Sequence, residues 1–220
     1  MSYNIEIIKK QQHITSKWSG GTTTELCIYP RDSLYVDRNF KWRISSAKVE
    51  VEESIFTSLP GIARIIMIIE GEILLKHEGH YNAVLKRFEQ DNFSGEWTTT
   101  SFGKVIDFNL MMAQDYNGKL ESIFLNKGET KDIILYSNVN ASLKFSQITE
   151  AFYVVKGDVE IVTGTKKIIN LNKGDLALVT TIEKENNLKF KIYSSQEESN
   201  IIRASIFYCK VVRKKDMDGK

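Results

Sequence analysis

The sequence lacks the features that define several special classes of protein. No apolar run is longer than five residues, the length of residues 65–69, whereas a helix that crosses a bilayer needs about 20. Residues 1–6 contain neither a basic nor an apolar segment, so we expect no signal peptide. The only two cysteines, Cys27 and Cys209, form no disulfide framework and no CxxC pair. We therefore expect a cytoplasmic protein that makes no membrane contact.

An excess of one charge sign is also lacking. The chain has 30 Lys and Arg against 28 Asp and Glu, which gives a formal net charge of +2 over 220 residues. The only basic cluster comprises Lys210, Arg213, Lys214 and Lys215, and a solvated terminus accounts for it. We expect no nucleic-acid partner.

Residues that favour helices are few. The chain has 8 Ala and 15 Leu against 26 Ile, 13 Val and 14 Thr, and β-branched side chains suit a pleated sheet. No window of 12 or more residues shows a helical period, and the best helical candidate is residues 114–120. Short apolar runs bounded by Gly, Asn and Asp predict strands at residues 3–8, 22–29, 41–49, 64–70, 73–77, 105–111, 133–136, 142–145, 151–156, 159–163, 176–181, 188–194 and 202–209.

A weak internal repeat divides this β-rich chain. Residues 67–73 resemble residues 153–159: each segment has an apolar strand, a charged residue, a glycine, an acid and a second strand. This pattern predicts a tight hairpin with Gly71 or Gly157 at positive φ. A second Gly-acid pair follows each copy, at residues 95–96 and 174–175. The repeat predicts two similar domains, residues 1–120 and 121–220.

Several motifs in the first half carry a family resemblance. They occur in one order at residues 18–26 (WSGGTTTEL), 29–30 (YP), 40–47 (FKWRISSA), 56–64 (FTSLPGIAR), 93–98 (FSGEWT) and 107–111 (DFNLM). The chain resembles the HutD/Ves family of the cupin superfamily, although its Gly-rich loop after Trp18 is shorter than in many members. The second half resembles only a degraded cupin. The resemblance implies an all-β protein with two cupin-type jelly-roll barrels, a bicupin, and an association with histidine utilisation or stress responses.

Histidine is scarce for a cupin. Most cupins hold a transition metal with His and Glu ligands, whereas this chain has only His13, His77 and His80. We expect His77 and His80 to be solvated side chains at a hairpin tip, and we expect no metal and no cofactor. Nucleophile and nucleotide-binding motifs are also absent, and Cys27 lies among apolar neighbours, which predicts a buried, inert thiol.

Polar side chains alternate with apolar ones on four predicted strands of the first barrel. Arg43 shares a face with Ser45, and Asp107 shares one with Asn109, because alternate residues of a strand point the same way. Arg64 lies on the face of Ile66 and Ile68. If these faces point inward, they line one polar pocket that suits a carboxylate. The candidate ligand-binding residues are Trp18, Thr23, Glu25, Arg43, Ser45, Arg64, Asp107 and Asn109; Cys27 and Tyr29 are expected on the face of Thr23 and Glu25.

These residues allow three functions. The first is a metal-independent bicupin that binds a small anionic ligand as a sensor or accessory protein. The second is a metal-independent isomerase or hydrolase with Glu25 or Asp107 as general base and Arg64 as electrophile. The third is a non-catalytic scaffold that forms a homodimer, with Arg43 and Arg64 in structural ion pairs. The second barrel is expected to have an apolar core without polar clustering, and to serve packing or dimerisation.

Overall fold

Four antiparallel sheets make up the protein. The computed structural model describes residues 3–134, 145–164, 166–181 and 189–209. The six-stranded sheet contains β2 (Ile14–Trp18), β3 (Gly21–Tyr29), β4 (Trp42–Val49), β11 (Ile106–Ala113), β6 (Ile62–Glu70) and β9 (Gln90–Ser94), in that order. The N-terminal four-stranded sheet contains β5 (Glu53–Ile55), β10 (Thr99–Phe102), β7 (Ile73–His77) and β8 (Asn82–Leu85). Together these two sheets form the N-terminal sandwich.

The C-terminal sandwich repeats this plan. Its five-stranded sheet contains β1 (Tyr3–Ile8), β17 (Leu176–Thr181), β14 (Phe145–Lys156), β19 (Glu198–Cys209) and β12 (Tyr116–Asn126). Its C-terminal four-stranded sheet contains β13 (Thr130–Ile134), β18 (Lys189–Ser194), β15 (Val159–Val162) and β16 (Ile168–Leu171). Two short 3-10 helices, η1 (Lys10–Gln12) and η2 (Tyr35–Asp37), complete the described structure.

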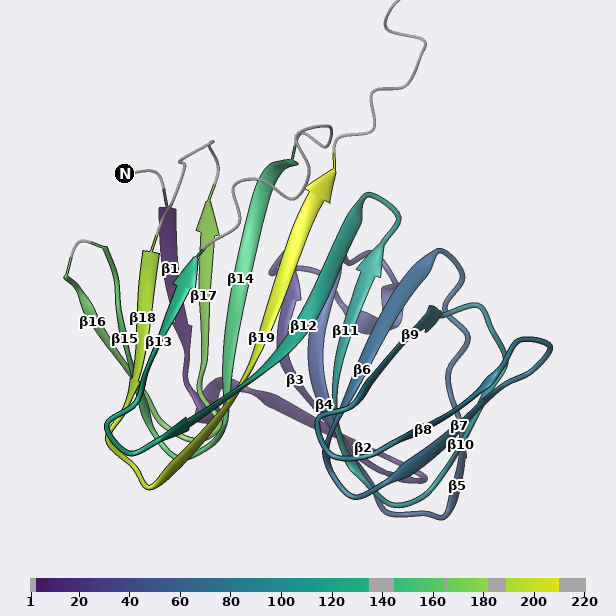
Figure 1. Ribbon diagram of the computed structural model, residues 1–220. Coiled ribbons are helices and arrows are strands. Elements are labelled where there is room, and N and C mark those ends of the chain that lie inside the picture. The colour runs from purple at the N-terminus through teal and green to yellow at the C-terminus, as the bar shows by residue number, and fades with distance from the viewer. Residues whose placement is uncertain (1–2, 135–144, 165, 182–188, 210–220) are drawn as a thin grey trace, which may run out of the picture.

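The four sheets stack as layers, with the two larger sheets in the middle (Figure 1). Side chains from both larger sheets form one apolar core between the sandwiches, and each sandwich has its own core behind. Strand β6 is therefore covered on both faces: Ile65 and Met67 face the other sandwich, whereas Ile66 and Ile68 face the N-terminal four-stranded sheet. A strand buried on both faces reads as a continuous apolar run, which explains residues 65–69.

The all-β prediction is confirmed, and residues 114–120, the best helical candidate in the sequence, contain no helix. The predicted strands within the described residues are present, while the strand predicted at 142–145 lies outside them except for Phe145. Residues 116–126 form β12, which pairs with β19 along its whole length. A Cβ on Gly118 would lie 2.9 Å from Leu110 of the neighbouring sandwich. Gly118 therefore allows two sheets to approach closely, a common use of glycine inside a strand.

The repeated Gly turns are real, but they are not hairpins. Gly71 and Gly157 have φ values of 90° and 72°, as predicted. However, β6 and β7 belong to different sheets, and so do β14 and β15. A Cβ at either glycine would lie 2.6 Å from a backbone carbonyl oxygen, of Lys104 or of Glu198. Each glycine thus lets the chain cross from an inner to an outer sheet at a crowded corner.

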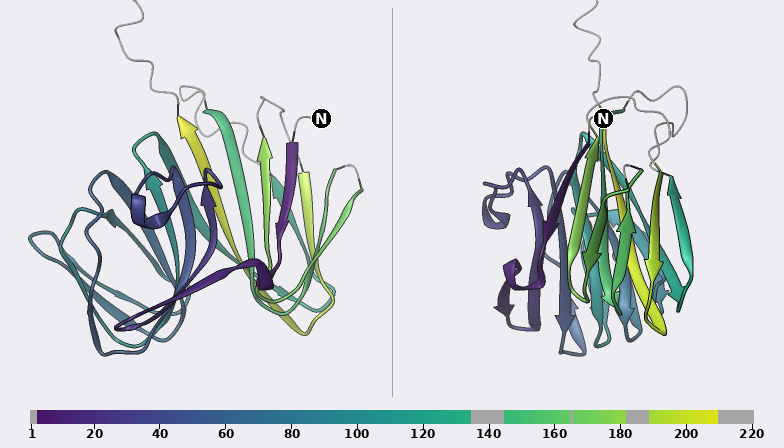
Figure 2. Two further views of the ribbon diagram at one scale, coloured as in Figure 1. Left: turned by 180° about the vertical axis from the view of Figure 1, so that it is seen from behind. Right: turned by 90° about the vertical axis from the view of Figure 1, so that its left-hand side faces the viewer.

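The first strand of the chain belongs to the second sandwich. The sequence-based division assigned residues 1–120 to the N-terminal barrel, yet β1 pairs with β17 of the five-stranded sheet. The chain then passes through η1 and enters the N-terminal sandwich as β2 (Figure 2). Asp175 secures this crossing, because its carboxylate accepts hydrogen bonds from the Lys10 backbone N–H at 3.0 Å and from Lys9 Nζ at 2.8 Å. Among the described residues no helix is long and apolar enough to span a bilayer.

Candidate ligand-binding pocket in the N-terminal sandwich

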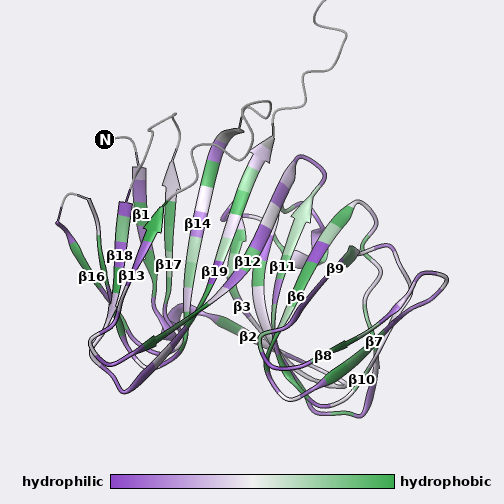
Figure 3. Cartoon of the chain, in the orientation of Figure 1, coloured by the Kyte–Doolittle hydropathy of each residue, from purple (hydrophilic) through white to green (hydrophobic). Residues whose placement is uncertain are grey.

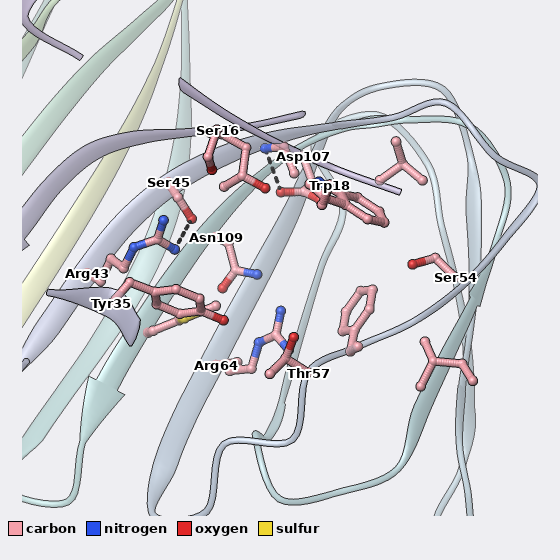
Figure 4. A pocket seen from close by; sticks show the side chains of 16 residues that line it. Ser16, Trp18, Tyr35, Arg43, Ser45, Ser54, Thr57, Arg64, Asp107 and Asn109 are labelled. Carbon is pink, nitrogen blue, oxygen red and sulfur yellow. Dashed lines mark hydrogen bonds between the residues drawn. The ribbon is translucent and has the colours of Figure 1, made fainter. Parts of the chain in front are cut away.

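A pocket of about 280 Å³ opens on the inner face of the six-stranded sheet. Strands β2, β3, β4, β6 and β11 supply one wall, and η2 together with residues 54–57 supplies the other (Figure 4). The lining residues are Ser16, Trp18, Thr23, Tyr35, Arg43, Ser45, Ala47, Val49, Ser54, Ile55, Phe56, Thr57, Arg64, Asp107, Asn109 and Met111.

Seven of the eight residues predicted from the sequence line this pocket: Trp18, Thr23, Arg43, Ser45, Arg64, Asp107 and Asn109. Glu25 does not line it and contacts Arg43 instead. The polar faces of β4, β6 and β11 point into the N-terminal sandwich, a direction that the alternation alone left open. Figure 3 shows a hydrophilic band that interrupts the otherwise apolar strand β6.

Strand β3 departs from the predicted alternation. We expected Cys27 and Tyr29 on the face of Thr23 and Glu25, but the register shifts between Glu25 and Cys27. The extra residue of such a bulge reverses the faces of all following side chains. Cys27 therefore packs into the core between the sandwiches, where burial raises the pKa of its thiol to about 12. The prediction of a buried thiol is confirmed.

Arg43 is neutralised by the protein itself. Its Nε donates to Glu25 Oε2 at 2.7 Å and its Nη1 donates to Ser45 Oγ at 3.1 Å. The guanidinium also lies 4.4 Å from the ring centroid of Tyr35. The ion pair that we considered between Arg43 and Glu25 is present, so Arg43 needs no anion from a ligand.

Arg64 has no such partner. Its side chain is buried, its Nε makes no hydrogen bond to any described residue, and no described carboxylate forms an ion pair with it. The guanidinium lies 4.6 Å from the ring centroid of Phe56 and 5.1 Å from that of Phe93. Burial lowers the pKa of Arg64 to about 10, while the charge of Asp107 opposes that fall. Arg64 is therefore a buried cation at neutral pH without a paired anion.

The carboxyl group of Asp107 holds its proton more tightly than an ordinary aspartate does. Burial raises the pKa of Asp107 to about 7, whereas a hydrogen bond from the Ala47 backbone N–H and the positive charge of Arg64 act in the opposite direction. The Ala47 bond is long, at 3.3 Å. Asn109 Oδ1 nearby is buried with no hydrogen-bond donor among the described residues. Buried polar groups normally have partners, so these groups indicate a site that a ligand completes.

Sequence analysis missed the second wall of the pocket. Tyr35 lies in a 3-10 turn, and Phe56 and Thr57 lie between β5 and β6, where no periodic pattern exists. The segment 56–64 was recognised as a motif, but only Arg64 was assigned to the site. Phe56, the first residue of this segment, could have been predicted as a contact of Arg64, since arginine often stacks on aromatic rings.

Gly20 sets the position of Trp18 at the pocket wall. A Cβ on Gly20 would overlap the indole ring of Trp18, which is 37% exposed. We expect Gly20→Ala to displace this ring toward solvent with little loss of stability. Acrylamide should then quench a larger fraction of the tryptophan emission, since Trp42 stays buried. The control is the same substitution in a Trp18→Phe background, where quenching should not change. Equal quenching of Gly20→Ala and the original protein would show that the ring has not moved.

The expectation of two solvated histidines is wrong for His77. Its ring is buried, with Nδ1 2.8 Å from Thr99 Oγ1 and Nε2 2.8 Å from Asp91 Oδ2. The ring centroid of His77 lies 4.6 Å from that of Phe93. His77 therefore packs against one of the two aromatic rings that contact Arg64. His80 is exposed and stacks on Trp97. No group of three His, Cys, Asp or Glu side chains that could hold a metal occurs within the part of the chain that the structure describes.

The C-terminal sandwich also contains a polar cluster, contrary to our expectation. Both carboxylate oxygens of Glu150 accept from Arg203, at 2.8 Å from Nε and 2.9 Å from Nη2. Ser205 Oγ donates to Glu150 Oε2 at 2.6 Å, and Arg203 also donates to Glu121 and to the Ile134 carbonyl. The cluster is almost wholly buried.

This cluster occupies the repeat positions that correspond to the pocket. Arg64 and Glu150 are separated by the same number of residues as Gly71 and Gly157. They are therefore equivalent positions of the repeat. In the N-terminal sandwich Ile66 pairs with Asn109, and the equivalent Phe152 pairs with Arg203. Arg203 thus stands where the pocket has Asn109, and Glu150 stands where it has Arg64. The second sandwich fills this position with an internal arginine–carboxylate pair.

Two stacked β-sandwiches in one chain, with a polar pocket inside the first, make this an all-β protein of two similar domains. The family model of HutD matches residues 10–197, and the chain belongs to the HutD family. The predicted fold class and family are therefore confirmed.

Solved structures share this fold. A conserved protein of unknown function from Pseudomonas aeruginosa PAO1 is 22% identical with a TM-score of 0.74, over 92% of this chain and 98% of that chain. HutD from Pseudomonas fluorescens SBW25 is 19% identical with a TM-score of 0.65, over 91% and 98%. Oxalate decarboxylase from Bacillus subtilis is 7% identical with a TM-score of 0.64, over 92% and 76%, which shows a shared fold alone. No curated protein matches the sequence.

Proposed function

We propose that the N-terminal sandwich binds a small carboxylate-bearing metabolite and that the protein acts as a sensor or accessory factor. The observation that carries this proposal is the unpaired, buried Arg64 beside an open cavity. A buried charge is costly unless it is paired, and a guanidinium matches a carboxylate with two parallel hydrogen bonds. Arg43 does not compete for this anion, because Glu25 already neutralises it.

The cavity limits the size of the ligand. Its volume of about 280 Å³ equals roughly nine water molecules at about 30 Å³ each. A short-chain acid fits this space. The open volume also argues against a purely structural scaffold, since protein side chains would then fill the site.

Family membership suggests where such an acid would originate. The HutD of P. fluorescens was solved in what its description calls a formate condition. By analogy with the family's association with histidine utilisation, urocanate, formiminoglutamate and formylglutamate are the first candidates, and each carries a carboxylate. This step depends on fold-level analogy.

A thermal-shift screen of small carboxylates tests the proposal. A ligand at about 100 times its Kd should add roughly 2.7 kcal/mol to the free energy of unfolding. The matched control for each acid is its uncharged amide, which keeps the size but cannot pair with Arg64. Stabilisation by acids and not by amides is the expected result. A flat screen, or equal shifts by both, would contradict a carboxylate pocket.

One observation favours an enzyme as the second candidate. A general base near neutral pH needs a raised pKa and no fixed arginine partner, and Asp107 meets both requirements among the described residues. Glu25 does not, because it is ion-paired with Arg43. An isomerase would exchange a carbon-bound proton of its acid with solvent. NMR detection of deuterium incorporation that is lost in Asp107→Asn would support catalysis, and no incorporation would favour binding alone.

A further inference from the structure

With Asp107 ionised, the charges of the pocket balance only while it is empty. Arg43 is matched by Glu25, which leaves Arg64 and Asp107 as the remaining charged groups that line the cavity. With Asp107 ionised these two cancel in sum, although no ion pair joins them within 4.0 Å. An added carboxylate would therefore leave one uncompensated negative charge in a buried space.

The strand register places Asn109 between these two groups. Arg64 pairs with Met111, and Asp107 pairs with Ile68, so Asn109 occupies the intervening position on the same face of β11. Figure 4 shows Arg64 and Asn109 pointing toward each other across this part of the cavity. An anion held by Arg64 lies over Asn109 and next to Asp107. Two carboxylates that share one buried site cannot both stay ionised, as in carboxylate pairs that share a proton.

We propose that the pocket binds a carboxylate together with one proton, so that the anion held by Arg64 is accompanied by Asp107 in its neutral form. The inference rests on the proposed function of the pocket. The proton comes from solvent, joins a carboxylate oxygen of Asp107, and returns to solvent when the ligand leaves. Neutral Asp107 then donates a hydrogen bond to the ligand carboxylate while still accepting one from the Ala47 N–H.

No other described group that faces Asp107 serves this role. Strand β4 presents Arg43, which is paired with Glu25, and η2 presents Tyr35, whose ring packs against the Arg43 guanidinium. Strand β3 presents Glu25, which is fixed on Arg43. The opposite wall contributes Ser54, Ile55, Phe56 and Thr57, none of which titrates. His77 and Asp91 pair with each other and do not line the cavity.

The pKa of Asp107 in the empty site determines whether carboxylate affinity rises or falls with pH. Burial raises the pKa of Asp107 to about 7, so the proton is already present below that pH and must be taken up above it. Carboxylate affinity should be constant at acidic pH and should fall about tenfold per pH unit above 7. The test stays below pH 8.5, because the pKa of Arg64 is lowered to about 10.

The experiment measures the affinity of acetate between pH 6 and 8.5 at constant ionic strength, by NMR titration in buffers without carboxylates. The original protein should lose about tenfold in affinity between pH 7.5 and 8.5, whereas Asp107→Asn should bind equally at all pH values. Asp115→Asn makes the same chemical change at an exposed position and should keep the original slope.

The outcomes distinguish failure of the proton coupling from failure of the carboxylate pocket. Acetate binding that is independent of pH in the original protein, or an unchanged slope in Asp107→Asn, overturns proton coupling and leaves the carboxylate pocket standing. If acetate binds neither protein at any pH, both the pocket and the coupling are wrong. Binding that persists in Arg64→Ala places acetate elsewhere and likewise overturns both.

Discussion

Replacing Arg64 with alanine is expected to weaken carboxylate binding by roughly 2–4 kcal/mol, a loss typical of a buried charge pair, while the fold survives. The sequence left two outcomes open, because a protein carboxylate could have neutralised this arginine. The structure argues against a protein partner: among the described residues no carboxylate lies in ion-pair distance, and Arg64 Nε has no hydrogen-bond acceptor. Removing an unpaired buried cation also removes its desolvation cost, so the melting temperature should change little.

The measurement compares melting temperature and affinity for the acids found by thermal shift. Arg31→Ala is the matched control, because Arg31 is exposed, pairs with Glu6 and does not line the cavity. That variant should retain full affinity. A large melting loss in Arg64→Ala with unchanged affinity would make Arg64 a structural residue, and the assignment of the binding site would be wrong.

Replacing Glu150 with alanine is expected to destabilise the protein by about 3–5 kcal/mol, because Arg203 then remains as a buried charge without its main partner. Glu150 is fully buried and accepts three hydrogen bonds from Arg203 and Ser205. Such a loss is a large fraction of the stability of an ordinary domain. Chemical denaturation of the purified variant measures it.

A double variant separates the charge effect from the loss of packing. Glu150→Leu combined with Arg203→Met removes both charges and keeps apolar volume, and buried pairs replaced in this way often lose little stability. We expect the double variant to be more stable than Glu150→Ala. The idea of a closed ion pair fails if Glu150→Ala costs less than about 1 kcal/mol, or if the double variant is the least stable protein of the set.

Period-two alternation was sufficient to group the polar side chains of β4, β6 and β11 on shared faces, but it left open whether those faces point inward. Each of these strands is buried, so a side chain on the wrong face would be costly, and the register is strongly specified. The same reasoning failed on β3, because a bulge after Glu25 reverses the faces. Nothing in the local sequence marks that bulge, since it arises from pairing with β4.

Contacts between residues that are distant in the sequence could not be predicted either. Glu150 and Arg203 are 53 residues apart, and each is a single charge inside an apolar strand, so neither segment alone shows a cluster. A lone charge in a strand that is otherwise buried is still a usable signal, since such a charge needs a partner. His77 was misjudged for a related reason: its position near a turn suggested exposure, while its partners Asp91 and Thr99 come from other strands.

The crossing of β1 has a consequence for the order in which the protein assembles during synthesis. Ile5 pairs with Val179, so β1 leaves the ribosome long before its partner strand β17. At about 5–20 residues per second, β1 waits roughly 10–30 s for β17. All strands of the N-terminal sandwich are translated in that interval. The N-terminal sandwich can therefore be complete on the nascent chain before β1 docks, and the docking of β1 fastens the two halves together as a late step.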